Sequence, residues 1–132
     1  MEVTTVEEVK RNGGFGSNHV YIGRSPNYGG TGVLGNDWTH KPLKWSMAKY
    51  HVATVEEAIA HYRVWLHFRI QLQDDEQVLR ALAGIGPRSI LVCHCKPGPC
   101  HGDVIVKAIE HLEETKPQWW VALREEELHI AK

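Results

Sequence analysis

Cysteine and histidine residues that could do chemistry are concentrated in one short stretch of the chain. All three cysteines lie between positions 93 and 100, and two of the nine histidines, His94 and His101, lie beside them. An apolar run, SILVC, leads into this stretch, and an amphipathic pattern follows it. A strand, a tight turn and a helix N-terminus in that order can bind an anion or hold a reactive thiolate. We therefore expect a functional site here.

Zinc coordination is one chemistry that these residue types allow, because thiolates and imidazoles are the ligands that zinc prefers. Cys93 and Cys95 are two positions apart, so on an extended strand both side chains point to one face. Cys100 and His101 return after a turn, but two adjacent residues would have difficulty ligating one ion. The spacing is also more compact than that of familiar zinc sites. A structural zinc module with these four residues as ligands is thus an alternative. The leading interpretation, given below, requires no cofactor.

A second interpretation is thiolate chemistry, because residues 94–101 (HCKPGPCH) resemble the tyrosine-phosphatase signature His-Cys-x2-Gly-x2-Arg. His101 stands where that signature has arginine, and an imidazole cannot copy the two-pronged clamp of a guanidinium on phosphate. Pro97 and Pro99 also remove backbone N–H donors from the phosphate-binding turn. These departures argue against phosphatase catalysis.

The leading interpretation is an anion-binding turn at a helix N-terminus, where backbone N–H groups and the helix dipole favour a phosphate. Lys96 and His101 would add positive charge. If the protein is an enzyme, we expect hydrolysis or group transfer at a phosphate or glycosidic centre, with a thiolate and an acid/base group from this turn. The catalytic candidates are Cys100, His101 and Asp103, and the ligand-binding candidates in the turn are Cys95, Lys96, Gly98 and Gly102.

A glycine-rich segment after a β-rich run supplies a second set of candidates. Residues 19–23 (HVYIG) alternate as a strand does, and the irregular stretch 24–42 follows it. Loops of this length in a small domain are usually functional. Gly23, Arg24 and Asn36 are the ligand-binding candidates here, and Trp38 could stack on a base.

Hydrophobic periodicity predicts the elements that position these segments. Residues 54–57 (TVEE) form a capping box, which predicts a helix from about Val55 to Ile70. A short helix is expected after Asp74 and before Gly84, a buried strand over 89–93, and a helix from Asp103 to about Glu114. Residues 119–121 (WWV) predict a last strand with an exposed indole, which would mark a homodimer contact.

This order predicts an α/β protein, specifically a single Rossmann-like three-layer sandwich with a small, mainly parallel sheet. The domain would span residues 1–132, with a core over 19–115 and peripheral segments at 1–18 and 116–132. Ligands of such sheets bind beyond the carboxyl ends of the strands. The loop 24–38 and the turn 95–103 should therefore meet at one cleft.

The amino-acid composition limits the classes of partner that we expect for this protein. Fifteen basic and sixteen acidic residues give a formal charge of −1, which argues against broad nucleic-acid binding. No apolar run approaches the ~20 residues that span a bilayer, and no signal-peptide core is apparent, so we expect a cytoplasmic protein without membrane contacts. Three clustered cysteines do not suit a secreted disulfide framework.

Four segments together resemble a family of bacteria and their phages known as domain of unknown function 4326. They are VYIGR, a Gly-Asn element about a dozen residues later, EEAIAHYRVWL, and LVCHCKPGPCHGDVI, and the resemblance covers roughly residues 19–115. This chain has Gly35-Asn36-Asp37-Trp38 where the family has Asn-Pro, and His94 where the family usually has an aromatic residue. The VYIGR strand is also similar to the first strand of nucleoside deoxyribosyltransferases. The resemblance implies the fold and the site location.

The sequence thus predicts binding of a nucleotide- or nucleoside-like ligand between the Arg24–Trp38 loop and the Cys95–Asp103 turn. Hydrolysis or transfer of that ligand is one extension of this prediction. A non-catalytic nucleotide sensor or sponge is the alternative that uses the same residues.

Overall fold

A parallel sheet is the centre of the structure, a computed structural model that describes residues 1–25, 28, 32–94 and 100–129. The sheet contains β1 (Glu2–Thr5), β5 (Ile90–Cys93) and β2 (His19–Tyr21), in the order β1-β5-β2. β5 lies in the middle, with Leu91 paired to Val3 on one side and to Val20 on the other. Since both pairings are parallel, all three carboxyl ends lie at one edge of the sheet. The mixed α/β class with a small parallel sheet is confirmed.

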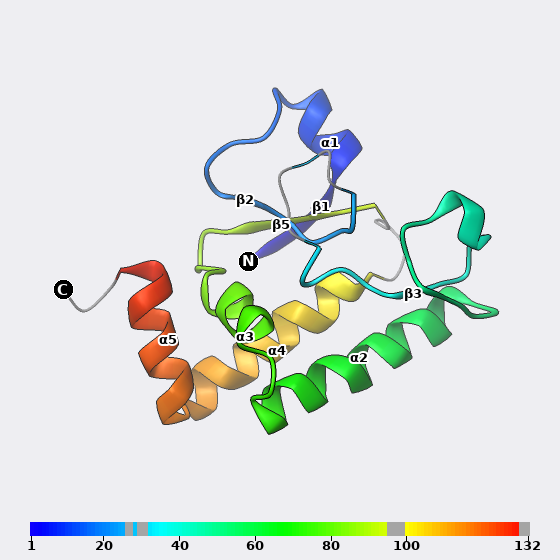
Figure 1. The fold of residues 1–132 in the computed structure, drawn as a ribbon. Helices are drawn as coiled ribbons and strands as arrows, with labels where there is room; N and C mark the ends of the chain where they lie inside the picture. The colour runs from blue at the N-terminus through cyan, green and yellow to red at the C-terminus, as the bar shows by residue number, and fades with distance from the viewer. Residues whose placement is uncertain (26–27, 29–31, 95–99, 130–132) are drawn as a thin grey trace.

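The two faces of the sheet bury different sets of side chains because successive residues of a strand point in opposite directions. Val92 packs with Val6 and Val9 of α1 (Val6–Arg11) on one face. Leu91 and Cys93 belong to the larger core on the other face. Figure 1 shows α1 on one side of the sheet and the remaining helices on the other.

The longest helix, α2 (Val55–Leu72), begins at the predicted capping box. The Glu57 backbone N–H donates to Thr54 Oγ1 over 3.1 Å, and the Glu57 carboxylate accepts from the backbone N–H of Ala53. The helix ends at Gln73, which adopts a left-handed conformation with φ 49°. The predicted helix is confirmed and extends two residues beyond Ile70.

The next two predicted helices are also present. α3 (Glu76–Ala83) is capped by Asp75 and ends at Gly84, as the sequence indicated. α4 (His101–Thr115) begins two residues before the predicted start because Cys100 is its N-cap.

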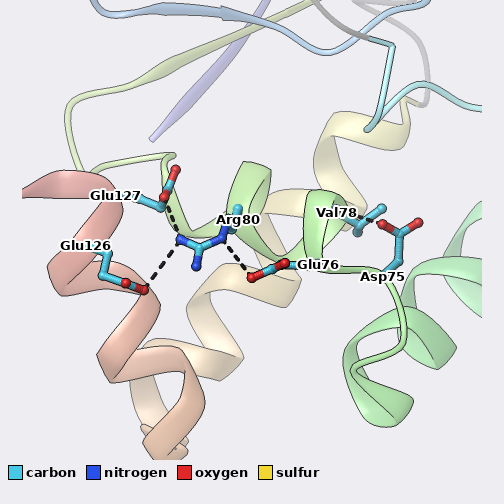
Figure 2. A network of polar contacts seen from close by, with 6 residues as sticks. All are labelled: Asp75, Glu76, Val78, Arg80, Glu126 and Glu127. Atoms are coloured by element: carbon cyan, nitrogen blue, oxygen red, sulfur yellow. Dashed lines mark hydrogen bonds and ion pairs between the residues drawn. The ribbon is translucent and has the colours of Figure 1, made fainter.

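The last element corrects a prediction, because residues 119–121 lie in a helix, α5 (Gln118–Leu128), and not in a strand. Trp120 is 1% exposed in the core, whereas Trp119 is partly exposed, and the homodimer contact stays a prediction. Arg124 lies over the Trp120 ring and donates to the Ala83 carbonyl. Arg80 of α3 pairs with acidic side chains of its own helix and of α5, as Figure 2 shows; they are Glu76, Glu126 and Glu127.

The chain between β2 and α2 contains short elements beside the N-terminal half of α2 (Figure 1). These are β3 (Trp38–Thr39), a 3-10 helix (Leu43–Trp45) and β4 (Tyr50–His51), with β3 and β4 paired in parallel. No helix in the described part of the chain is long and apolar enough to cross a membrane. The terminal segments outside the family-like core contribute β1 and α5 to the packed structure.

Candidate functional site

One cleft lies where β2 and β5 end, and both segments singled out in the sequence contribute to it. Its volume is about 370 Å³, within the ~300–1,000 Å³ range of small-molecule sites. Residues from the end of β2, the loop before α2, the first turns of α2, the end of β5 and the start of α4 line it: Tyr21, Gly23, Arg24, Ser25, Asn36, Trp38, Thr39, His40, Lys41, Ser46, Met47, Ala48, Val55, Ala58, Ile59, His94 and His101.

A tyrosine and a histidine from neighbouring strand ends form a hydrogen-bonded pair in this cleft. Tyr21 Oη lies 2.8 Å from His94 Nε2, and the backbone N–H of Ser25 donates to the same hydroxyl over 3.1 Å. Among the described residues, His94 Nε2 is the one recorded partner of that hydroxyl that can accept, so we assign the hydroxyl proton to this bond. The His94 proton is then on Nδ1. A Cβ at position 23 would collide with the Tyr21 hydroxyl, so Gly23 makes room for the pair.

Partial burial shifts the pKa values of this pair in opposite directions. It raises the pKa of Tyr21 above 10.0 and lowers the pKa of His94 below 6.5, because both charged forms lose hydration. At neutral pH the cleft thus contains a neutral phenol that donates to a neutral imidazole.

Arg24 follows β2 and is held under the loop that precedes β3. Its Nη2 lies 2.6 Å from Asp37 Oδ1 and donates to the Gly35 carbonyl over 3.1 Å. The Nε atom is buried and has no hydrogen-bond partner in the described part of the chain. A Cβ at position 35 would collide with the Arg24 side chain, so the loop can approach only with glycine there. Arg24 is therefore largely enclosed by protein, and its positive charge is already partly compensated by Asp37.

Asn36 and Trp38 shape the opposite wall. The Asn36 side chain donates to the Ala58 carbonyl over 3.2 Å and accepts from the Trp38 backbone N–H over 3.0 Å. Its amide fastens the loop to α2, so the hydrogen-bonding groups of this ligand-binding candidate are already engaged within the protein. The Trp38 ring stacks on His61 with centroids 5.3 Å apart and an interplanar angle of 8°. The Tyr50 ring also lies 5.4 Å from the Trp38 ring, at an interplanar angle of 31°, and Trp38 lines the cleft.

His101 reaches the cleft from a largely buried position. Its Nε2 lies 2.8 Å from the Ile22 carbonyl, which can only accept, so Nε2 carries the proton. Its ring meets that of Tyr62 edge-on at 5.0 Å, and the residue is 6% exposed. Burial lowers the pKa of His101 below 6.5, which keeps the imidazole neutral at pH 7. Only a small part of this candidate faces a ligand.

The other two catalytic candidates do not line this cleft. Cys100 is 1% exposed, and its Sγ accepts from the Gly102 backbone N–H over 3.3 Å as the N-cap of α4. A Cβ at Gly102 would lie 2.9 Å from Val3 Cγ1, so Gly102 allows α4 to pack closely on the sheet. Cys100 and Asp103 instead line a second cavity, between α2 and α4.

The zinc alternative depends partly on a residue that lies outside the described part of the chain. Cys93 is fully buried in the core at the end of β5. A small apolar residue would be buried there in the same way. Among the described residues, no group of three or more candidate ligands could hold a metal ion. Cys95, Lys96 and Gly98 belong to residues 95–99, so the predictions made for them are untested.

Several cleft residues were not found from the sequence. Tyr21 and His94 are far apart in the chain, so only the parallel pairing of β2 with β5 brings them together. Lys41, and Asp37 that pairs with the cleft residue Arg24, lie in the irregular segment, where no periodic pattern indicates which side chains turn inward. The arrangement offers hydrogen-bond donors, imidazoles, a lysine and an indole around one apolar-walled space.

Comparisons with known proteins identify a family and no individual relative. A family model described as "Domain of unknown function (DUF4326)" matches residues 7–111. A search of curated proteins and a search of solved structures each found no match. Because the family model covers most of the chain's 132 residues, the protein belongs to the DUF4326 family.

Proposed function

We propose that the cleft at the carboxyl ends of β2 and β5 binds a nucleotide- or nucleoside-like ligand. The observation that carries this proposal is the meeting of the Gly23–Ser25 segment and His94 in one cleft that Trp38 and Lys41 also line. The Trp38 indole is suited to stacking on a base. Lys41 is exposed at the same cleft and is suited to a phosphate.

The location of the cleft supports the same proposal. Ligands of parallel α/β sheets bind beyond the carboxyl ends of the strands, and the cleft lies there. We also propose that the fold is a Rossmann-like three-layer sandwich and that the protein acts in the reducing cytoplasm. The two hydrophobic clusters on opposite faces of the sheet support the three-layer fold. The clustered cysteines support the cytoplasm.

The Tyr21–His94 pair and His101 are the groups that would handle protons if the ligand is consumed. His94 lines the cleft, and the hydroxyl of Tyr21 holds its ring in place. A neutral imidazole beside a bound phosphate ester could donate or accept a proton at pH 7. A sensor would use the same groups for recognition alone, and the two functions differ in whether the bound ligand is turned over.

Thermal unfolding with nucleosides, nucleoside monophosphates and inorganic phosphate tests the proposal. A ligand that binds only the folded state raises the melting temperature, and at 100 times Kd the gain is ~2.7 kcal/mol. We expect a shift of several degrees with at least one nucleotide and a smaller shift with the matching nucleoside. Chromatography of the recovered ligand then separates turnover from simple binding.

Two variants locate the binding. Lys41→Gln should weaken nucleotide binding but spare nucleoside binding, whereas Trp38→Leu should weaken both. Lys49→Gln is the matched control, because Lys49 is an exposed lysine of the same segment that does not line the cleft. Absence of a shift with every compound, or an equal loss in the Lys49 control, would overturn the proposal.

A further inference from the structure

A second groove runs between α2 and α4, which lie side by side and run in the same direction (Figure 1). Its volume is about 440 Å³. The stretch of α2 from Ile59 to Ile70 would make it roughly 16 Å long at the ~1.5 Å rise of a helix. The apolar residues that line the groove alternate between the two helices: Ile59, Leu66 and Ile70 from α2, and Val104, Ala108 and Leu112 from α4.

Basic side chains border this apolar floor on both sides. Arg63 and His67 are one turn apart on α2, and Lys107 and His111 are one turn apart on α4. All four are exposed, whereas the floor residues are buried or partly buried. Asp103 is the one acidic residue among those that line the groove.

The two permanent cations of this border have no ion-pair partner within the described part of the chain. Neither Arg63 nor Lys107 takes part in a salt bridge, although Arg69 on α2 pairs with Asp74. The partly exposed Arg80 shows the alternative arrangement, because it pairs with three carboxylates. Positive charge on the groove is thus left for a ligand or partner to complement.

The shape and charge together indicate the kind of partner. An apolar floor with cations along both borders complements a helix whose apolar stripe has acidic residues on either side. A single-headed small molecule would place its charge at one point, whereas the four basic groups are distributed along the groove. The length corresponds to about three turns of a docked helix.

We propose that the groove between α2 and α4 binds an acidic amphipathic helix of a partner protein. The apolar stripe of that helix would contact Leu66, Ala108 and Leu112. Its carboxylates would pair with Arg63 and Lys107 and accept from the two imidazoles. This surface does not depend on the nucleotide proposal, since the two sites share only Ile59 among their lining residues.

The test uses two synthetic helices with the same leucine stripe at i, i+3, i+4 and i+7. One carries glutamates beside the stripe and the other carries lysines. Each has about 18 residues, since isolated helices below ~12–15 residues are marginal. Fluorescence anisotropy should show saturable binding of the glutamate peptide to the full chain and at least tenfold weaker binding of the lysine peptide. Added salt should weaken the first interaction, because exposed charges are screened.

Charge reversal makes the test specific. Arg63→Glu/Lys107→Glu should weaken the glutamate peptide at least tenfold and create binding of the lysine peptide. Arg88→Glu/Lys49→Glu is the control, because both positions are exposed and neither lines the groove. Ala108→Phe should block both peptides by filling the floor, with its unfolding midpoint measured to confirm that it folds.

The proposal fails under any of three results. The glutamate peptide does not bind the native chain; it binds the charge-reversed protein as well as the native one; or a folded Ala108→Phe protein binds it unchanged. If both peptides bind the native chain equally, the groove recognises apolar surface alone, which also overturns the proposal.

Discussion

His94 and His101 lie on either side of residues 95–99 and line the same cleft, yet they differ in burial, partner and tautomer. His94 is exposed, and its Nε2 accepts from the hydroxyl of a side chain, Tyr21. His101 is 6% exposed, and its Nε2 donates to a backbone carbonyl. The proton is therefore on Nδ1 in His94 and on Nε2 in His101.

This difference shows that a cysteine- and histidine-rich segment can contain residues with separate roles. The His101 end holds the first turn of α4 against the sheet, with Cys100 as N-cap and Gly102 in close contact with β1. The His94 end leaves an imidazole where a ligand can reach it. Reactive residue types in one short segment can thus divide into buried residues that pack the core and exposed residues that stay accessible.

The largest expected contrast is in stability. His101→Ala should lower the free energy of unfolding by about 2–4 kcal/mol, because it leaves the buried Ile22 carbonyl unpaired and opens a cavity beside Tyr62. His94→Ala should cost less than about 1 kcal/mol, since its position is exposed. Urea unfolding of both variants measures the two values. Equal losses would remove the distinction between the two histidines.

The pH dependence of stability should follow the same division. Burial lowers the folded-state pKa of both histidines below 6.5, so the unfolded chain binds more protons once the pH falls below that value. Their contribution to stability is fully present above about pH 6.5 and is lost as the pH falls toward the folded pKa values. We expect unfolding free energies measured between about pH 7.5 and about pH 5.5 to decline.

His101→Gln should flatten that decline more than His94→Gln, because the deeper imidazole loses more hydration on folding. A native chain whose stability rises on acidification through this range would contradict the assignment of neutral buried imidazoles. An equal flattening in the two variants would show that burial does not separate them.

The smallest expected effect is spectroscopic. Tyr21→Phe removes the donor to His94 Nε2, so the His94 ring should shift toward the Nε2–H tautomer, while His101 keeps its Nε2–H bond to the Ile22 carbonyl. Nitrogen-15 chemical shifts of the two rings distinguish the tautomers. An unchanged His94 spectrum would mean that Tyr21 does not orient the ring.

The helices and the central strand were predictable because their signals are local. Thr54 and Glu57 identify the start of α2, Gly84 the end of α3, and the spacing of Val104, Ile105, Ile109 and Leu112 the inner face of α4. The strand β1 has only four residues and runs directly into α1, so no alternating pattern could develop. Trp119 and Trp120 have β propensity, but this segment forms helix α5, in which Trp120 is buried in the core.

The meeting of the two candidate segments was predictable, and the roles of individual residues were not. Parallel strands place their carboxyl ends together, which is why the loop after β2 reaches the cleft beside His94. Which side chains turn inward depends on contacts between distant residues, such as Arg24 with Asp37 and Tyr21 with His94. No local pattern contains that information.

The middle position of β5 has a consequence for how the chain folds during synthesis. Both of its neighbours, β1 and β2, leave the ribosome long before it does, and they do not pair with each other in the finished sheet. The sheet can therefore form only after Cys93 has left the ribosome and β5 has inserted between β1 and β2. Such late, non-local pairing slows folding and leaves strand edges open to other chains. Fragments that end before β5 should aggregate, whereas the full chain should fold after release.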